Sequence, residues 1–215
     1  MSLFQDTQGI SAIAMAETPA DLAAIHRPDC AAAIWRRQPL PSFQSWIDQV
    51  SPDQLPETRI ILSPEKVHSA ASHICELCGT PNCVERARLI DDVSALADIF
   101  AGLMNASYLM FRLDIVATNH CRQFRKDTIP VRLICTYRGT GTQYGFSMDR
   151  AEPQRVETVP TGAPIILRGN RWLEHPTSGL VHRSPPIEGS GETRLVLVLD
   201  PVAAPDEQPR EYYLH

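Results

Sequence analysis

The chain has 215 residues, of which 43% are hydrophobic and 21% are charged, and its net charge is −5. These values are ordinary for a soluble globular protein, and the length allows one sizeable domain. The small negative charge excludes a broad electrostatic attraction to nucleic acid or to anionic membranes.

The sequence shows no sign of export or of membrane insertion. No apolar stretch approaches the roughly 20 residues that a membrane helix needs. Residues 1–6 lack the basic segment, followed by an apolar one, of a signal peptide. We therefore expect a cytoplasmic protein. We also expect its six cysteines to be reduced thiols, buried or bound to metal, rather than disulfides.

The first half of the chain is predicted to be mainly helical. Thr18-Pro19 opens a helix over residues 18–28, and a short buried strand covers residues 31–35. Apolar side chains at helical spacing indicate a second helix over residues 43–50. The strongest helical pattern covers residues 85–104 and ends near Gly102 to Asn105.

The pattern changes to strands after Asn105. Apolar or alternating runs separated by glycine-containing turns cover residues 108–116, 131–137, 154–159, 163–167 and 194–199. Several short strands at this spacing are typical of a sandwich or barrel. We predict an α+β fold in one folded unit. In it a helical N-terminal portion (1–105) packs on a double-stranded β-helix, a jelly-roll or cupin-like barrel (106–204), and a tail follows (205–215).

Three residues of the second half follow the layout of the metal site in jelly-roll enzymes. In that layout a His-x-Asp or His-x-Glu pair and a distant histidine bind iron(II), and an arginine on the next strand binds a carboxylate. Asp127, His182 and Arg194 occupy three of the four positions in the right order. The fourth position is Arg125, which cannot bind a metal because arginine stays protonated.

A complete metal site would therefore need another ligand. His120 or Cys121 could supply it, and we take Cys121 with Asp127 and His182 as the candidate metal ligands. Structural roles remain open, because Asp127 could form a turn before the next strand and a lone histidine is usually hydrogen-bonded without binding metal. The candidates for holding a small carboxylate are Arg194, Arg132 and Tyr137.

A second cluster lies in the first half and consists of His73, Cys75, Cys78 and Cys83. A Cys-x-x-Cys pair with a nearby cysteine and histidine has the donor set of tetrahedral zinc. The turn after Cys78 could fold Cys83 back toward the pair. The other interpretation is a helix that carries small, partly buried thiols.

Several strings of the sequence resemble a known family. They are Ala33-Ile-Trp-Arg-Arg37, Cys121-x-x-Phe124-x-x-Asp127, Thr136-Tyr137-x-Gly139-x-Gly141-Thr142 and Val181-His-Arg-Ser-Pro185. Over residues 20–200 the chain is similar to the bacterial family named domain of unknown function 1826. The resemblance implies a soluble bacterial protein and, in some genomes, a link to zinc homeostasis and metallochaperone-type GTPases. It implies no established activity. The family motif has histidine where this chain has Arg125, which puts a metal role in doubt.

Three functional hypotheses remain. The first is a jelly-roll pocket that binds a metal or a small carboxylate, with a Fe(II)/2-oxoglutarate-type oxygenase as its enzymatic form. The second is a non-catalytic zinc-handling protein, with or without a protein partner. The third is an interaction module without metal. We rank a binding protein above an enzyme and zinc above iron(II) as the cofactor, and we expect no nucleic-acid or membrane partner.

Overall fold

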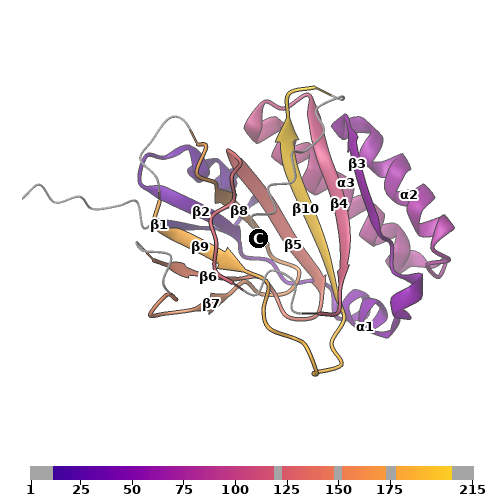
Figure 1. Cartoon of the computed structure of the whole chain (residues 1–215). Coiled ribbons are helices and arrows are strands. Elements are labelled where there is room, and N and C mark those ends of the chain that lie inside the picture. The colour runs from indigo at the N-terminus through magenta and orange to yellow at the C-terminus, as the bar shows by residue number, and fades with distance from the viewer. Residues whose placement is uncertain (1–11, 119–122, 148–151, 173–177, 205–215) are drawn as a thin grey trace, which may run out of the picture.

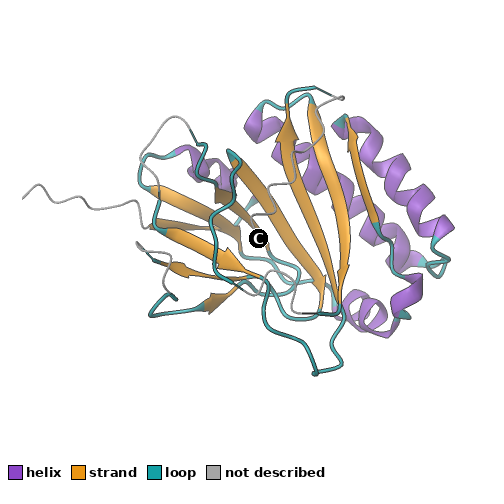
Figure 2. Cartoon of the chain, viewed as in Figure 1, coloured by secondary structure: helices purple, strands orange, loops and turns teal. Residues whose placement is uncertain are grey.

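The computed structural model describes residues 12–118, 123–147, 152–172 and 178–204. The described residues form two β-sheets and a group of helices (Figure 2). The strands are β1 (Ala12–Ala16), β2 (Cys30–Trp35), β3 (Thr58–Leu62), β4 (Tyr108–Val116), β5 (Val131–Arg138), β6 (Gln143–Phe146), β7 (Glu157–Thr158), β8 (Pro164–Arg168), β9 (Leu180–Arg183) and β10 (Arg194–Val202). The α-helices are α1 (Pro41–Gln49), α2 (Val67–Leu77) and α3 (Val84–Met104), and the 3-10 helices are η1 (Pro19–His26), η2 (Pro52–Gln54) and η3 (Pro64–Lys66).

The larger sheet has seven strands in the order β1-β2-β8-β5-β10-β4-β3, and the smaller one has three in the order β7-β6-β9. All neighbouring strands are antiparallel except β1 and β2, which are parallel. Helices α2 and α3 cover one face of the larger sheet, and the smaller sheet lies on its other side (Figure 1). The fold therefore has three layers: helices, large sheet and small sheet.

Side chains that alternate between the two faces of the central strands form two separate apolar cores. On β10, Leu195, Leu197 and Leu199 belong to the core beneath the helices, while Val196 and Val198 belong to the core between the sheets. Successive strand residues point to opposite faces. Polar residues at the even positions of β10 therefore share the space between the sheets.

Helix α3 confirms the strongest helical prediction. Its buried face is built from apolar residues at helical spacing: Leu89, Ile90, Val93, Leu96, Ala97, Phe100 and Ala101. The helix ends at Asn105, which adopts the left-handed conformation (φ 48°) common after a helix C-terminus. Within the described ranges, no helix has the length and apolar character to cross a membrane.

The α+β class is confirmed, but the predicted closed barrel is not found, because the described strands form two separate sheets. The strand predicted over residues 31–35 is found as β2, but the first 105 residues also contribute the unpredicted strands β1 and β3 to the two ends of the large sheet. Within residues 18–28, Pro19–His26 form the 3-10 helix η1 instead of an α-helix, and of residues 154–159 only Glu157–Thr158 is a strand. His182 lies in strand β9, which is not among the strands predicted from the sequence.

Candidate functional site

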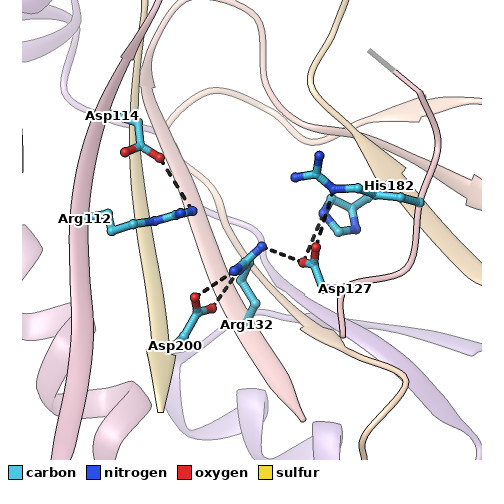
Figure 3. A network of polar contacts seen from close by, with 7 residues as sticks. Arg112, Asp114, Asp127, Arg132, His182 and Asp200 are labelled. Carbon is cyan, nitrogen blue, oxygen red and sulfur yellow. Dashed lines mark hydrogen bonds and ion pairs between the residues drawn. The ribbon is translucent and has the colours of Figure 1, made fainter. Parts of the chain in front are cut away.

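A group of charged side chains lies between the two sheets, on the inner face of the large one (Figure 3). Arg132 comes from the start of β5, Asp200 from β10 and His182 from β9. Asp127 comes from the segment before β5. This segment is fixed by the backbone N–H of Asn170, which donates to the carbonyl of Asp127 at 3.0 Å. Residues distant in the sequence thus meet at one point.

Arg132 is the centre of this ion-pair cluster. Its Nε and one terminal nitrogen donate to the two carboxylate oxygens of Asp200, both at 2.7 Å. The other terminal nitrogen donates to Asp127 Oδ2 at 2.8 Å. A planar guanidinium matches a carboxylate in this two-pronged way. Arg132 therefore binds two carboxylates of the protein itself, which leaves it poorly placed for the predicted role of holding a ligand.

Asp127 also contacts the residues predicted to surround a metal. His182 Nε2 lies 3.3 Å from Asp127 Oδ2, and Arg125 Nε lies 3.5 Å from Asp127 Oδ1. The backbones of Arg125 and His182 pair through N–H···O=C bonds of 3.0 Å in both directions. The structure therefore brings Asp127 and His182 together, as predicted from their spacing. Cys121 and His120 lie outside the described residues, and the role of Cys121 stays a prediction.

Burial and charge act in opposite directions on the pKa of Asp127. Burial raises this pKa. The positive charges of His182 (when protonated), Arg132 and Arg125 lower it by a larger amount, so the pKa of Asp127 lies below its usual value. Burial lowers the pKa of His182, and the nearby arginines add to this effect against the attraction of Asp127. At neutral pH the pair is therefore a carboxylate beside a neutral imidazole.

This pKa shift of His182 predicts a loss of stability on mild acidification. Because the imidazole pKa is lower in the folded chain, the unfolded chain binds more protons between that pKa and about 6.5. The free energy of unfolding should therefore fall as the pH decreases through this window. A second loss, from Asp127, should appear only below about pH 4, because its folded pKa is lowered. Urea unfolding at a series of pH values measures both.

The variant His182→Gln should show a flatter pH dependence above the Asp127 window. His68→Gln is the matched control. The His68 side chain is exposed, and its Nε2 lies 3.2 Å from the exposed carboxylate of Asp91. An equal slope in the wild type and in His182→Gln would show that His182 does not carry the effect.

Arg112 and Asp114 on β4 extend the cluster, and the sequence analysis did not identify them. Arg112 lies opposite Val198 of β10, so its side chain shares the inner face of the sheet. Among the described residues its Nε is buried without a hydrogen-bond acceptor, and its terminal nitrogen approaches Asp114 only to 3.6 Å. The side chains of Arg112 and Asp114 are 20% and 39% exposed. Two charges alternating in an otherwise apolar strand were the available sequence signal.

The space behind Asp127 and His182 is nearly closed. A cavity of only about 10 Å³ lies there, lined by these two residues and by Leu167, Gly169 and Leu180 among others. Such a cavity holds about one water molecule. A larger groove of about 430 Å³ lies at the other end of β5, beside Gly139, and is remote from the cluster. The space directly behind Asp127 and His182 is therefore too small for an organic ligand.

The described residues do not fit a divalent metal ion at this point. Asp127 and His182 offer one oxygen ligand group and one nitrogen, whereas Arg125 stands at the third position and Arg132 already occupies an Asp127 oxygen. Over the described part of the chain, no three His, Cys, Asp or Glu side chains form a group that could hold a metal. The donor set is thus too small, and the nearest charges are positive.

Tyr137 lies apart from this cluster, contrary to its predicted role in holding a carboxylate. Its hydroxyl donates to Asp92 Oδ2 at 2.7 Å, and Arg37 binds both oxygens of Asp92 at 2.6 and 2.7 Å. Burial raises the pKa of Tyr137 well above its usual value. Tyr137 therefore joins α3 to β5 on the helix face of the sheet.

Arg194 is buried at the opposite end of β10 from Asp200. The two residues are six positions apart along the strand, which corresponds to roughly 20 Å. The Arg194 guanidinium donates to the carbonyl of Thr140 at 2.6 Å and to Thr136 Oγ1 at 3.3 Å. Burial lowers its pKa to about 10, against the attraction of Glu192. Arg194 thus holds the turn after β5 in place, and its predicted role in binding a carboxylate stays a prediction.

The four predicted zinc ligands do not form a group either. Cys75 points from α2 into the core, and burial raises its pKa. His73 is exposed two residues earlier, and such a separation places side chains on nearly opposite sides of a helix. Cys78 follows α2 and Cys83 precedes α3. The structure supports the alternative of a helix carrying a buried thiol, and nothing in it supports zinc.

Comparison with known proteins identifies the family. A model of the family described as "Protein of unknown function (DUF1826)" matches residues 16–200. The chain belongs to this family. A search among curated proteins found no significant match.

The DUF1826 chain also has the fold of known dioxygenases. It is 13% identical to the dioxygenase for auxin oxidation of rice, with a TM-score of 0.51 over 91% of this chain and 84% of that one. It is 9% identical to the dioxygenase for auxin oxidation 1 of Arabidopsis thaliana, solved with 2-oxoglutarate, with a TM-score of 0.54 over 89% and 92% of the two chains. At such low identities the likeness establishes the fold alone. The expected oxygenase-like fold is confirmed in this sense.

Proposed function

We propose that the protein binds a small organic carboxylate between the two sheets and does so without a metal ion. Arg112 carries this proposal. Its buried Nε has no acceptor among the described residues, and its contact with Asp114 is longer than a hydrogen bond. A buried donor without an acceptor is costly in a folded protein. A ligand carboxylate would satisfy it through the two-pronged geometry that guanidinium groups favour.

The surroundings of Arg112 support access and orientation. Arg125 is the most exposed arginine of the cluster, with 45% of its side chain accessible, and its Nε reaches Asp127 only at 3.5 Å. It can therefore turn toward a second carboxylate group of a ligand. Arg132 is held in one position by its ion pairs with Asp127 and Asp200, and it lies beside the proposed site. A dicarboxylate suits Arg112, whose Nε lacks an acceptor among the described residues, together with the half-exposed Arg125.

An oxygenase of the Fe(II)/2-oxoglutarate type is the alternative function, and the fold likeness favours it only weakly. The described residues lack its metal ligands, as shown above. The structure of the Arabidopsis enzyme contains 2-oxoglutarate, a dicarboxylate. This compound is therefore the first probe for both functions, and the dependence on metal distinguishes them.

Calorimetric titration with 2-oxoglutarate and succinate tests the proposal. We expect binding in the presence of excess EDTA. Replacing Arg112 by glutamine should remove charge-assisted hydrogen bonds to the ligand of about 1.5–3 kcal/mol. The Kd should therefore rise by roughly tenfold or more. Arg36→Gln is the control, because Arg36 is exposed and pairs with Glu17 away from the cluster. Binding that appears only after Fe(II) is added would favour the oxygenase, and no binding in either condition would contradict both.

A further inference from the structure

The positions of Arg125, Asp127 and His182 relative to one another resemble a three-ligand site. Arg125 and His182 are directly paired across an antiparallel bridge. Directly opposite residues project to the same side, and so does a residue two positions further along an extended chain. The contacts agree, because both His182 and Arg125 reach Asp127, at 3.3 and 3.5 Å. Side chains at positions 125, 127 and 182 therefore converge.

The group at position 125 is a cation instead of a ligand. A guanidinium has five N–H donors and no lone pair to offer a metal, and it keeps its proton at any ordinary pH. Here it faces Asp127 Oδ1, while Arg132 donates to Asp127 Oδ2 at 2.8 Å. Each oxygen of this carboxylate thus already has a positive partner. A divalent ion in the same place would meet two fixed cations in a poorly solvated site.

The charges of the cluster balance one another without a metal ion. Asp200 binds Arg132 through both of its oxygens, so the second cation is itself balanced and held in place. A buried carboxylate persists when it is paired and hydrogen-bonded. His182 needs no metal to be placed either, because its backbone pairs with that of Arg125. The cluster is complete as a set of ion pairs.

We infer that the guanidinium of Arg125 takes the place of a divalent metal ion beside Asp127 and His182. The chain thus has a metal-free form of a three-ligand site, in which position 125 supplies a cation where a metal ligand would stand. The cobalt(II) test of this inference is independent of the proposed carboxylate binding, in which Arg112 is the first contact and Arg125 the second.

Titration with cobalt(II), followed by visible absorption and calorimetry, tests this inference on the full chain. The wild type should bind no stoichiometric cobalt(II) at positions 127 and 182. Arg125→His supplies a neutral imidazole at the converging position, and neutral imidazole is a common metal ligand. Even outer partners of a metal ligand change affinity by roughly 10–100-fold, so a new direct ligand should raise the cobalt(II) affinity at least about tenfold.

Two further variants separate the charge from the ligand. Arg125→Gln removes the cation without adding a ligand nitrogen, and it should gain much less affinity than Arg125→His. The double variant Arg125→His with His182→Gln should lose the gain. One equivalent of cobalt(II) on the wild type that disappears in His182→Gln would overturn the inference. So would an Arg125→His protein, shown to be folded by circular dichroism, that binds no better than the wild type. Because the Arg125 side chain is 45% exposed, we expect the two single variants at position 125 to fold.

Discussion

Replacement of Arg132 by methionine should destabilise the protein by about 3–5 kcal/mol, because it leaves two buried carboxylates without their cation. The side chains of Arg132, Asp127 and Asp200 are only 12%, 10% and 13% exposed. Water therefore cannot replace the guanidinium as the hydrogen-bond partner of the two carboxylates. Methionine keeps most of the apolar stem and removes only the charge. Urea unfolding at neutral pH measures the loss of free energy.

The pH dependence of this loss identifies its cause. Without Arg132, burial should raise the pKa of Asp127 in the folded chain above its unfolded value near 3.9. The folded variant would then bind more protons than its unfolded chain, so its stability should rise as the pH decreases toward about 4. The wild type should show the opposite trend, because its Asp127 pKa is lowered. The difference in the free energy of unfolding between the wild type and Arg132→Met should therefore become smaller as the pH decreases.

An exposed ion pair provides the control for Arg132→Met. Arg155 pairs with Glu157 at the surface, where 86% and 43% of the two side chains are accessible. Exposed pairs contribute little, so Arg155→Met should change the free energy of unfolding by less than about 1 kcal/mol. A loss of similar size for both variants would show that the cluster around Arg132 has no special role in stability.

The sequence was sufficient to place Asp127 and His182 in one site, because their order and spacing follow a known layout. It was not sufficient to find their partners. Asp200 meets Arg132 because β5 and β10 pair with Leu133 opposite Leu199. Such a register depends on the packing of both faces of the sheet and cannot be predicted from the sequence of either strand alone. The same holds for Arg112, which reaches the cluster from a third strand.

Other errors had causes that local rules could have revealed. Arg132 and Tyr137 are five positions apart in one strand, and an odd separation places two side chains on opposite faces. Tyr137 could therefore not accompany Arg132. Strands β1 and β3 were missed for a different reason. They are short, lie at the two ends of the sheet order and lack a clear alternation, as the burial pattern of β3 shows with exposed Arg59 and Ile60.

Replacement of Gly169 by alanine should destabilise the protein by about 3 kcal/mol, since it forces atoms into a closely packed backbone. An added Cβ would lie 1.9 Å from the carbonyl oxygen of Ile129 and 2.9 Å from that of Asp127. Both are backbone atoms, which cannot rotate away like the end of a long side chain. The Gly169 N–H also donates to Pro130 at 2.8 Å, which holds the two segments together. The variant should therefore displace Asp127 as well.

The same substitution at Gly102 should have the opposite sign. Gly102 lies within α3, and a Cβ there would meet no atom within 4 Å. Alanine favours the helix over glycine, so Gly102→Ala should stabilise the protein by up to about 1 kcal/mol. Urea unfolding compares both variants with the wild type. A Gly169→Ala protein within about 0.5 kcal/mol of the wild type would contradict the close packing of the Asp127 segment against β8. If the packing is as described, Gly169→Ala should also change the pH dependence assigned to His182, because the carboxylate beside that imidazole will have moved.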